Sequence, residues 1–151
     1  MAGTQLPFLR LMRSLDAIAA RHRLDVVAQT ADPGFVAQAM RTRPFLAPSD
    51  FDAHVAAAEL VVAHAGMGVI IAAAEHGKPL VLMPRRAELG EHRNDHQQAT
   101  ARRFAGACGL RLAEDEASLE AAVLAADRVG FGLVASHRRH SLIEAVRRAL
   151  R

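Results

Sequence analysis

The chain has a single cysteine, Cys108, and neither tryptophan nor tyrosine. One cysteine cannot form an internal disulfide, which agrees with a reducing compartment. Aromatic residues make up only 4% of the sequence, so most of the stacking surface that single-strand nucleic-acid binders use is absent. The longest apolar run without charge, residues 69–74, is far shorter than the roughly 20 residues that a membrane-spanning helix needs. The first residues also lack the pattern of a secretory leader, so we expect a cytoplasmic protein.

The composition is that of one compact domain. The 151 residues are 51% hydrophobic, which suffices for a sizeable core, and we expect a single domain over residues 1–151. The formal net charge is +3, from 19 Lys and Arg against 16 Asp and Glu. This mild basic excess fits an anionic ligand or a membrane surface at least as well as nucleic acid.

Hydrophobic patterning divides the chain into alternating strands and helices. The predicted strands cover residues 24–29, a stretch within 36–46 that ends near Phe45, and residues 60–63, 80–83 and 110–112. The predicted helices cover residues 7–21, 50–58, 69–76, 95–108, 116–126 and 136–150. Strands that alternate with helices pair in parallel through right-handed crossovers. We therefore expect a doubly wound α/β fold with a mostly parallel sheet, in which ligands bind at the carboxyl ends of the strands.

Three of these helices have recognisable end signals. Ser49 is the expected N-cap of the helix over 50–58, with Asp52 as an imperfect capping-box partner. Gly77 takes the C′ position after the helix over 69–76. Asn94 and Gln97 are the expected capping pair of the helix over 95–108.

The stretch from His64 to Gly68 joins an apolar strand to an Ala-rich helix, and we predict that it is the centre of a ligand site. Gly66 and Gly68 let the main chain approach a ligand closely, and a helix N-terminus attracts negative charge. A phosphate or diphosphate is the ligand that we expect at this turn. Two glycines after a strand are also common in ordinary turns, and their spacing matches neither the dinucleotide fingerprint nor a P-loop.

The histidines near this turn have two interpretations each. His64 is either a core histidine that hydrogen-bonds the main chain or a ligand contact at the end of a strand. One interpretation makes Glu91, His92, Asp95 and His96 a metal-binding cluster, since His92 and His96 lie four residues apart, as metal ligands on one helix face do. A helix that begins near Asn94 leaves His92 outside it, so we favour a role for His96 and Gln97 in gripping diphosphate or sugar hydroxyls.

Arginines cluster at two places. Arg85, Arg86 and Arg93 form either a solvated charged loop or, beside the suspected anion site, a phosphate contact. The expected last helix, residues 136–150, is basic and amphipathic. It packs on its own sheet or meets a partner or an anionic lipid surface.

Four segments together resemble one known family. They are residues 63–68 (AHAGMG), 75–80 (EHGKPL), 83–86 (MPRR) and 90–97 (GEHRNDHQ). In this order and spacing the chain resembles the glycosyltransferase family 28 C-terminal domain. It resembles especially the small PssE-type subunits of bacterial exopolysaccharide synthesis, which are relatives of the soluble subunit of the eukaryotic dolichol-linked N-acetylglucosamine transferase. Residues 3–8 (GTQLPF) also match the opening loop of that branch.

The resemblance implies the C-terminal, Rossmann-like half of a GT-B glycosyltransferase, which binds a UDP-sugar as substrate and needs no catalytic metal or other cofactor. The acceptor half and the membrane anchor would belong to a separate PssD-like subunit, so this chain would lie peripherally at the inner face of the membrane. In isolation it could form a homo-oligomer, and no nucleic-acid partner is implied. The general base would be on the partner subunit, so no catalytic residue is assigned here.

The resemblance also implies site residues. Gly66 to Gly68 would face the diphosphate, His96 and Gln97 would contact phosphate or the donor sugar, and Thr4 would line the cleft towards the partner. Phe45 and Leu46 would lie near the uracil. The full predicted donor-binding set is Thr4, Gln5, Phe45, Leu46, His64, Ala65, Gly66, Met67, Gly68, Arg85, Glu91, His92, Asp95, His96 and Gln97.

Three features depart from the family pattern. Val69 replaces the serine that is frequent after the second glycine, which removes a hydroxyl contact to phosphate. Ala72 stands where MurG-type relatives carry a ribose-binding glutamate, and Glu75 matches the PssE-type branch instead, so the ribose-binding residue is unassigned. The family also has an apolar strand before its Gly-Thr loop, at the centre of the sheet, to which only the first two residues here correspond. A gap there would leave main-chain N–H and C=O groups without hydrogen-bond partners. Either the true start therefore lies upstream, or a neighbouring segment or chain fills the slot.

Two other hypotheses stay open at this point. The first is a non-catalytic nucleotide-sugar or nucleotide sensor that kept the fold and lost turnover. The second is a metal-dependent hydrolase that uses His92 and His96.

Overall fold

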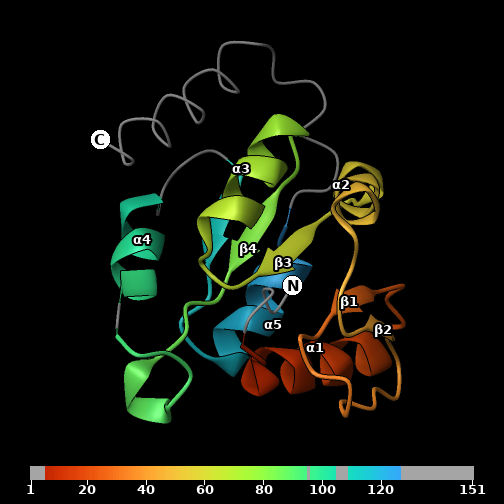
Figure 1. Cartoon of the computed structure of the whole chain (residues 1–151), viewed down its shortest axis with the longest axis horizontal. Coiled ribbons are helices and arrows are strands. Elements are labelled where there is room, and N and C mark those ends of the chain that lie inside the picture. The colour runs from red at the N-terminus through yellow and green to blue at the C-terminus, as the bar shows by residue number, and fades with distance from the viewer. Residues whose placement is uncertain (1–5, 95, 105–108, 127–151) are drawn as a thin grey trace.

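The computed structural model describes residues 6–94, 96–104 and 109–126 (Figure 1). In chain order its elements are α1 (Leu9–His22), β1 (Val27–Gln29), β2 (Arg41–Arg43), α2 (Pro48–Ala57), β3 (Val61–Ala63), α3 (Met67–Glu75), β4 (Leu80–Leu82), the 3₁₀ helix η1 (Ala87–Leu89), α4 (His96–Phe104), β5 (Leu110–Leu112) and α5 (Glu116–Leu124). Strands and helices alternate along most of the described chain, as the hydrophobic pattern predicts.

Every described strand pair is parallel, and the predicted doubly wound α/β fold is confirmed. β1 pairs with β2, and β4 lies between β3 and β5 in a second sheet. In this second sheet Leu80 is opposite Val61 on one side and Leu110 on the other. The described strands thus form two sheets, one of two strands and one of three.

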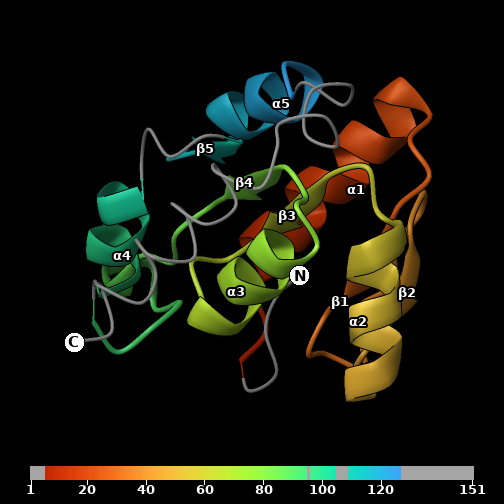
Figure 2. The same ribbon diagram turned by 90° about the horizontal axis from the view of Figure 1, so that it is seen from above.

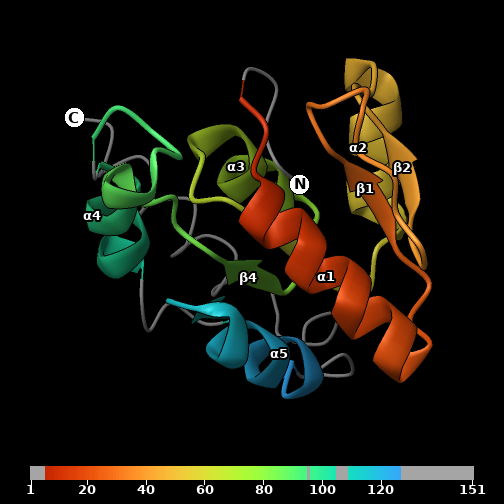
Figure 3. The same ribbon diagram turned by 90° about the horizontal axis from the view of Figure 1, so that it is seen from below.

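Helices cover both faces of the second sheet (Figures 2 and 3). Alternate strand residues supply the two cores. Val81 of β4 packs in the core that contains residues of α1 and α5. Its neighbours Leu80 and Leu82 pack in the core that contains residues of α3 and α4. This alternation follows from the two-residue period of a strand, whose successive side chains point to opposite faces.

Helix α1 joins the two sheets through its apolar face. Its buried residues are Leu11, Met12, Leu15, Ile18 and Ala19. They share one core with Ala28 of β1 and Val81 of β4. Burial of a leucine or isoleucine side chain contributes about 1.5–3 kcal/mol, so this face is a main source of stability for both sheets.

The end of α3 forms as predicted. Gly77 has φ 61°, a left-handed conformation that glycine adopts without strain. Its N–H donates to the Ala74 carbonyl oxygen at 3.2 Å, and the Lys78 N–H donates to the Ala73 carbonyl oxygen at 2.8 Å. These two bonds make a Schellman motif, which satisfies carbonyl groups at the helix end.

The predicted start of α2 is wrong. The helix begins at Pro48 rather than after Ser49, and no side chain caps it. Proline has a fixed φ that suits the first helical position, so it sets the start one residue earlier than the expected cap. The expected capping-box partner Asp52 instead contacts Nε2 of His76, the C-cap residue of α3, at 2.6 Å.

Several boundaries differ from the predictions. The strand predicted over 24–29 is confined to β1, because α1 closes with Arg23 in a left-handed conformation and the Leu24 N–H donates back to the Ala19 carbonyl oxygen. Cys108 and the predicted helix over 136–150 lie outside the described residues. None of the helices that the structure describes is long and apolar enough to cross a bilayer.

Candidate functional site

The predicted site segments follow neighbouring strands at the same edge of the second sheet. The turn from His64 to Gly68 follows β3, and the loop of residues 84–93 follows β4, its parallel neighbour. Carboxyl ends of parallel strands lie side by side, so these two segments form adjacent walls of the candidate site. The loop then leads into the N-terminus of α4.

The turn after β3 presents the first turn of α3. The Gly66 N–H donates to the His64 carbonyl oxygen at 2.8 Å, which closes a three-residue turn. Gly66 is the N-cap of α3, and no side chain within the described residues caps this helix. The first N–H groups of α3 and the positive end of its dipole are therefore available to an anion.

The residues of this turn have different surroundings. A Cβ atom on Gly66 would collide with the imidazole of His64, so that ring would have to shift to admit a side chain there. A Cβ atom on Gly68 would meet no heavy atom within 4 Å, and Gly68 is not among the glycines with positive φ. Ala65 and Met67 pack into the core beneath α3. Contact with the His64 ring therefore favours a small residue at position 66, whereas close approach of a ligand is the physical reason that suits Gly68.

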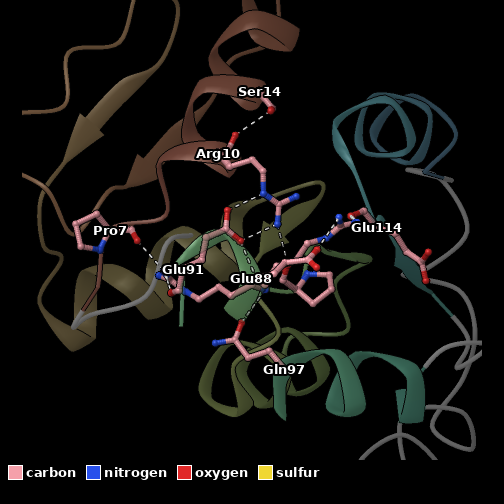
Figure 4. Close-up of polar contacts among 10 residues, drawn as sticks. Pro7, Arg10, Ser14, Glu88, Glu91, Gln97 and Glu114 are labelled. Atoms are coloured by element: carbon pink, nitrogen blue, oxygen red, sulfur yellow. Dashed lines mark hydrogen bonds and ion pairs between the residues drawn. The ribbon is translucent and has the colours of Figure 1, made fainter. Parts of the chain in front are cut away.

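Arg85, a predicted donor contact, is buried with 2% of its surface exposed. Its Nη1 donates to the carbonyl oxygens of Pro7 at 2.7 Å and Glu91 at 3.0 Å, two residues that Figure 4 labels. Its Nη2 donates to the carbonyl oxygen of Leu6. Its guanidinium carbon lies 4.7 Å from the centre of the Phe8 ring. Burial lowers the pKa of Arg85, against the opposing charge of Glu91. The guanidinium thus binds the protein main chain.

Glu91, another predicted donor contact, pairs with Arg10 of α1 (Figure 4). Arg10 Nε donates to Glu91 Oε1 at 2.7 Å and Arg10 Nη2 donates to Glu91 Oε2 at 2.8 Å, a two-bond geometry. The Arg86 N–H also donates to Glu91 Oε2, at 2.9 Å. Each side chain of the pair is only 12% exposed. Arg10 in addition donates to the Pro84 carbonyl oxygen at 3.1 Å.

Both members of this pair have shifted pKa values. Burial alone raises the pKa of Glu91, but hydrogen bonds from Arg10 and the Arg86 N–H, with the charges of Arg10 and Arg85, outweigh burial and hold it below its ordinary value. The hydrogen bond to Glu91 raises the pKa of Arg10. The pair is therefore fully ionised at neutral pH.

No sequence motif identifies Arg10 as a site residue. The signal that could have found it is its place in the first turn of α1. A cation there lies at the positive end of the helix dipole, where acidic residues are favoured. Such a residue needs an acidic partner from elsewhere in the chain, which here is Glu91.

The start of α4 differs from the predicted capping pair. The Asn94 Oδ1 accepts a long hydrogen bond of 3.4 Å from the His96 N–H. The Gln97 Oε1 accepts from the Arg85 N–H at 3.3 Å and so does not cap the helix. With Oε1 engaged, the Nε2 group of Gln97 is its remaining hydrogen-bonding group. No buried side-chain nitrogen or oxygen of the described residues lacks a partner. His96 is exposed beside it.

The remaining predicted residues contribute little to this geometry. His92 Nδ1 lies 3.2 Å from the Asn94 carbonyl oxygen. In the part of the chain that the structure describes, no three His, Cys, Asp or Glu side chains are grouped so that they could hold a metal ion. Thr4, Gln5 and Asp95 lie outside the described residues.

The loop after β2 places Phe45 at the surface. The Leu46 N–H donates to Oε1 of the buried Gln29 at 2.9 Å, which pins this loop to the end of β1. Leu46 is buried and Phe45 is 60% exposed. An exposed aromatic ring on an anchored loop can stack on a planar base, and the uracil contact of these two residues stays a prediction.

Comparison with known proteins gives a family and a fold. The model of the glycosyltransferase family 28 C-terminal domain matches residues 21–130, well over half of the chain. No curated protein matches. The crystal structure of the glycotransferase of kitacinnamycin is similar with a TM-score of 0.67 and 22% identity. The similar region covers 98% of this chain and 38% of that one, so the chain spans well under half the length of that enzyme.

Proposed function

The chain belongs to the glycosyltransferase family 28 C-terminal domain family, and we propose that it is the donor-binding part of an inverting, two-component UDP-glycosyltransferase. The proposed reaction transfers a hexose or N-acetylhexosamine to a lipid-linked acceptor in polysaccharide synthesis, at the cytoplasmic face of the membrane. A membrane-anchored partner subunit supplies the acceptor site and the general base. These finer features rest on the resemblance of the motifs to the PssE-type branch.

The open N-terminus of α3 carries the proposal. Its first N–H groups have no side-chain cap among the described residues, and Gly68 leaves open space beside them. Oriented N–H groups and a helix dipole stabilise the negative charge that develops on a departing diphosphate. The Nε2 donors of Gln97 and the ring of His96 add hydrogen-bond donors from α4.

A second candidate is a nucleotide-sugar-binding protein that has lost turnover. Val69 and Ala72 are buried in the core beneath α3, so neither presents a polar group to a ligand. Glu75 ends α3, about 12 Å along the helix axis from Met67 at 1.5 Å per residue. This helix therefore offers no carboxylate near the turn to hold a ribose. Sugar transfer in the presence of the membrane partner separates the two candidates.

Calorimetry with UDP tests the proposal. We expect weak binding to the purified chain, and a loss of about tenfold or more in affinity for Gly68→Asp, because the carboxylate repels the diphosphate. His96→Ala should also weaken binding. Ser49→Asp is the matched control, since Ser49 is the exposed second residue of α2 as Gly68 is of α3. Absence of UDP binding with the intact partner present would contradict the proposal.

A further inference from the structure

A network of buried charges joins the first turn of α1 to the loop of residues 84–93. Glu91 receives two hydrogen bonds from Arg10 and one from the Arg86 N–H, so its carboxylate is engaged inside the protein. A free carboxylate next to a diphosphate site would repel the ligand, and here the charge of Arg10 compensates it. Neither side chain has the exposure of a ligand-contacting group.

We infer that Arg10 and Glu91 are positioning residues that hold the loop of residues 84–93 on α1 and thereby set the place of Gln97 in the diphosphate site. This inference rests on the proposed function. It assigns a role to Arg10, which no sequence motif identified. Glu91 then affects ligand binding through the residues that it positions.

The path from this pair to the ligand runs through Arg85. The side chain of Arg85 binds the carbonyl oxygens of Leu6, Pro7 and Glu91, so it fixes the loop relative to the segment that enters α1. The main-chain N–H of Arg85 binds Gln97 Oε1. A shift of the loop therefore moves the side-chain amide of Gln97, which the proposed function assigns to the diphosphate site.

Packing makes this network rigid. The Phe8 ring is fully buried, and its centre lies 4.7 Å from the guanidinium carbon of Arg85 and 5.3 Å from that of Arg10. A paired guanidinium and carboxylate with two parallel hydrogen bonds fix both distance and orientation. A lysine at position 10 would keep the charge and lose that orientation.

The opposite end of α1 offers a matched control. There Glu120 of α5 contacts Arg21 and His22. These contacts also tie α1 to another element, but they are more exposed than the Arg10–Glu91 pair and lie at the other end of the helix. Glu120→Gln therefore disturbs an α1 contact without touching the loop of residues 84–93.

The experiment compares the full-length wild type with Arg10→Ala, Arg10→Lys, Glu91→Gln, the double variant Arg10→Ala/Glu91→Gln, and Glu120→Gln. Three quantities are measured for each: UDP affinity by calorimetry, the rate of trypsin cleavage after Arg85 and Arg86, and the urea midpoint of unfolding. Cleavage there reports how often the start of the loop, where Arg85 is buried, opens to the protease. The urea midpoint shows how much of any effect is global.

We expect Arg10→Ala and Glu91→Gln to raise the cleavage rate and lower UDP affinity by about tenfold each, with the double variant no worse than either, since the two residues act as a unit. Arg10→Lys should lie between wild type and Arg10→Ala. Glu120→Gln should lower the urea midpoint and leave UDP affinity and cleavage unchanged.

Either of two results in the Arg10 and Glu91 variants would overturn the inference: unchanged cleavage, or faster cleavage with unchanged UDP affinity. An equal loss of affinity in Glu120→Gln would do the same. If the wild type binds no UDP even with the intact partner present, the proposed function fails and the link to a diphosphate site fails with it. Faster cleavage in the variants would in that case still support anchoring of the loop by this pair.

Discussion

The imidazole of His64 occupies the space into which a side chain at Gly66 would project, so that a Cβ atom there would collide with its Nε2 and Cε1 atoms. Both atoms belong to the far end of a side chain that can rotate. Gly66 has φ −93° and ψ 139°, which alanine also adopts. We therefore expect Gly66→Ala to displace the His64 ring at a cost of about 0.5–1.5 kcal/mol in unfolding free energy, the cost of an off-rotamer side chain. UDP affinity should fall as the turn is distorted.

The double variant His64→Ala/Gly66→Ala checks this explanation. Without the imidazole, the added methyl group has room, so the unfolding free energy of the double variant should equal that of His64→Ala within about 0.5 kcal/mol. Urea unfolding measures all three variants. Additive losses in the double variant would show that the collision is not the cause.

Gly68→Ala separates stability from binding at the same turn. A methyl group at this position meets no described atom, and alanine is favoured over glycine in a helix by about 1 kcal/mol. We expect the thermal midpoint to rise or stay unchanged, while UDP affinity falls because the methyl group fills the space that the diphosphate needs. Calorimetry and thermal unfolding on one sample provide both values. Equal UDP affinity would remove the argument that glycine is there for the ligand.

Much of the fold could be predicted from the sequence because its signals are local. The run Leu80 to Met83 predicts a strand buried on both faces, and β4 is that strand. Gly77 predicts the end of α3, because only a left-handed residue can close the helix there. The period of apolar residues also places α1 to within about two residues at each end, the usual uncertainty of helix boundaries.

The contacts of the site could not be predicted in the same way because they join distant parts of the chain. Arg85 was predicted beside a ligand from its place after a strand, but its guanidinium binds carbonyl oxygens almost eighty residues away in sequence. Gln97 was predicted as a helix cap, yet the Arg85 N–H takes its Oε1. Which partner a polar side chain takes depends on which elements the fold brings together, and spacing along the chain does not contain that information.

Asp16 should be a stabilising residue outside the site. Its two carboxylate oxygens accept from the main-chain N–H groups of Gln38 and Ala39, each at 2.9 Å, and so tie α1 to the segment before β2. We expect Asp16→Ala to lower the unfolding free energy by about 1–3 kcal/mol, because charged acceptors make the stronger hydrogen bonds. Asp25→Ala is the control: its ion pair with Arg41 is exposed, and such pairs contribute about 0–1 kcal/mol. Equal losses in urea unfolding would contradict the assignment.

The variant Phe45→Ala should separate the contribution of the uracil base to UDP binding from that of the diphosphate. Its ring is 60% exposed, so Phe45→Ala should leave the thermal midpoint unchanged. Loss of stacking should weaken UDP binding by about twofold to tenfold and leave pyrophosphate binding unchanged. Val36→Ala, which alters a more exposed apolar side chain, should change neither affinity. A parallel loss for UDP and pyrophosphate in Phe45→Ala would place the ring away from the uracil.

The ionisation of Glu91 should make the free energy of unfolding depend on pH in the acidic range. Its pKa lies below the ordinary glutamate value, so the folded protein keeps this carboxylate ionised at a pH where the unfolded chain binds a proton. The contribution of Glu91 is therefore complete above roughly pH 4.3 and is lost as the pH falls through the lowered pKa. Glu91→Gln lacks this titration, so its deficit in unfolding free energy should be largest at neutral pH, about 1.5–3 kcal/mol, and should shrink towards about pH 3. Urea unfolding of both proteins across this range measures the difference. A constant deficit would mean that the Arg10–Glu91 pair does not stabilise the fold through its charge.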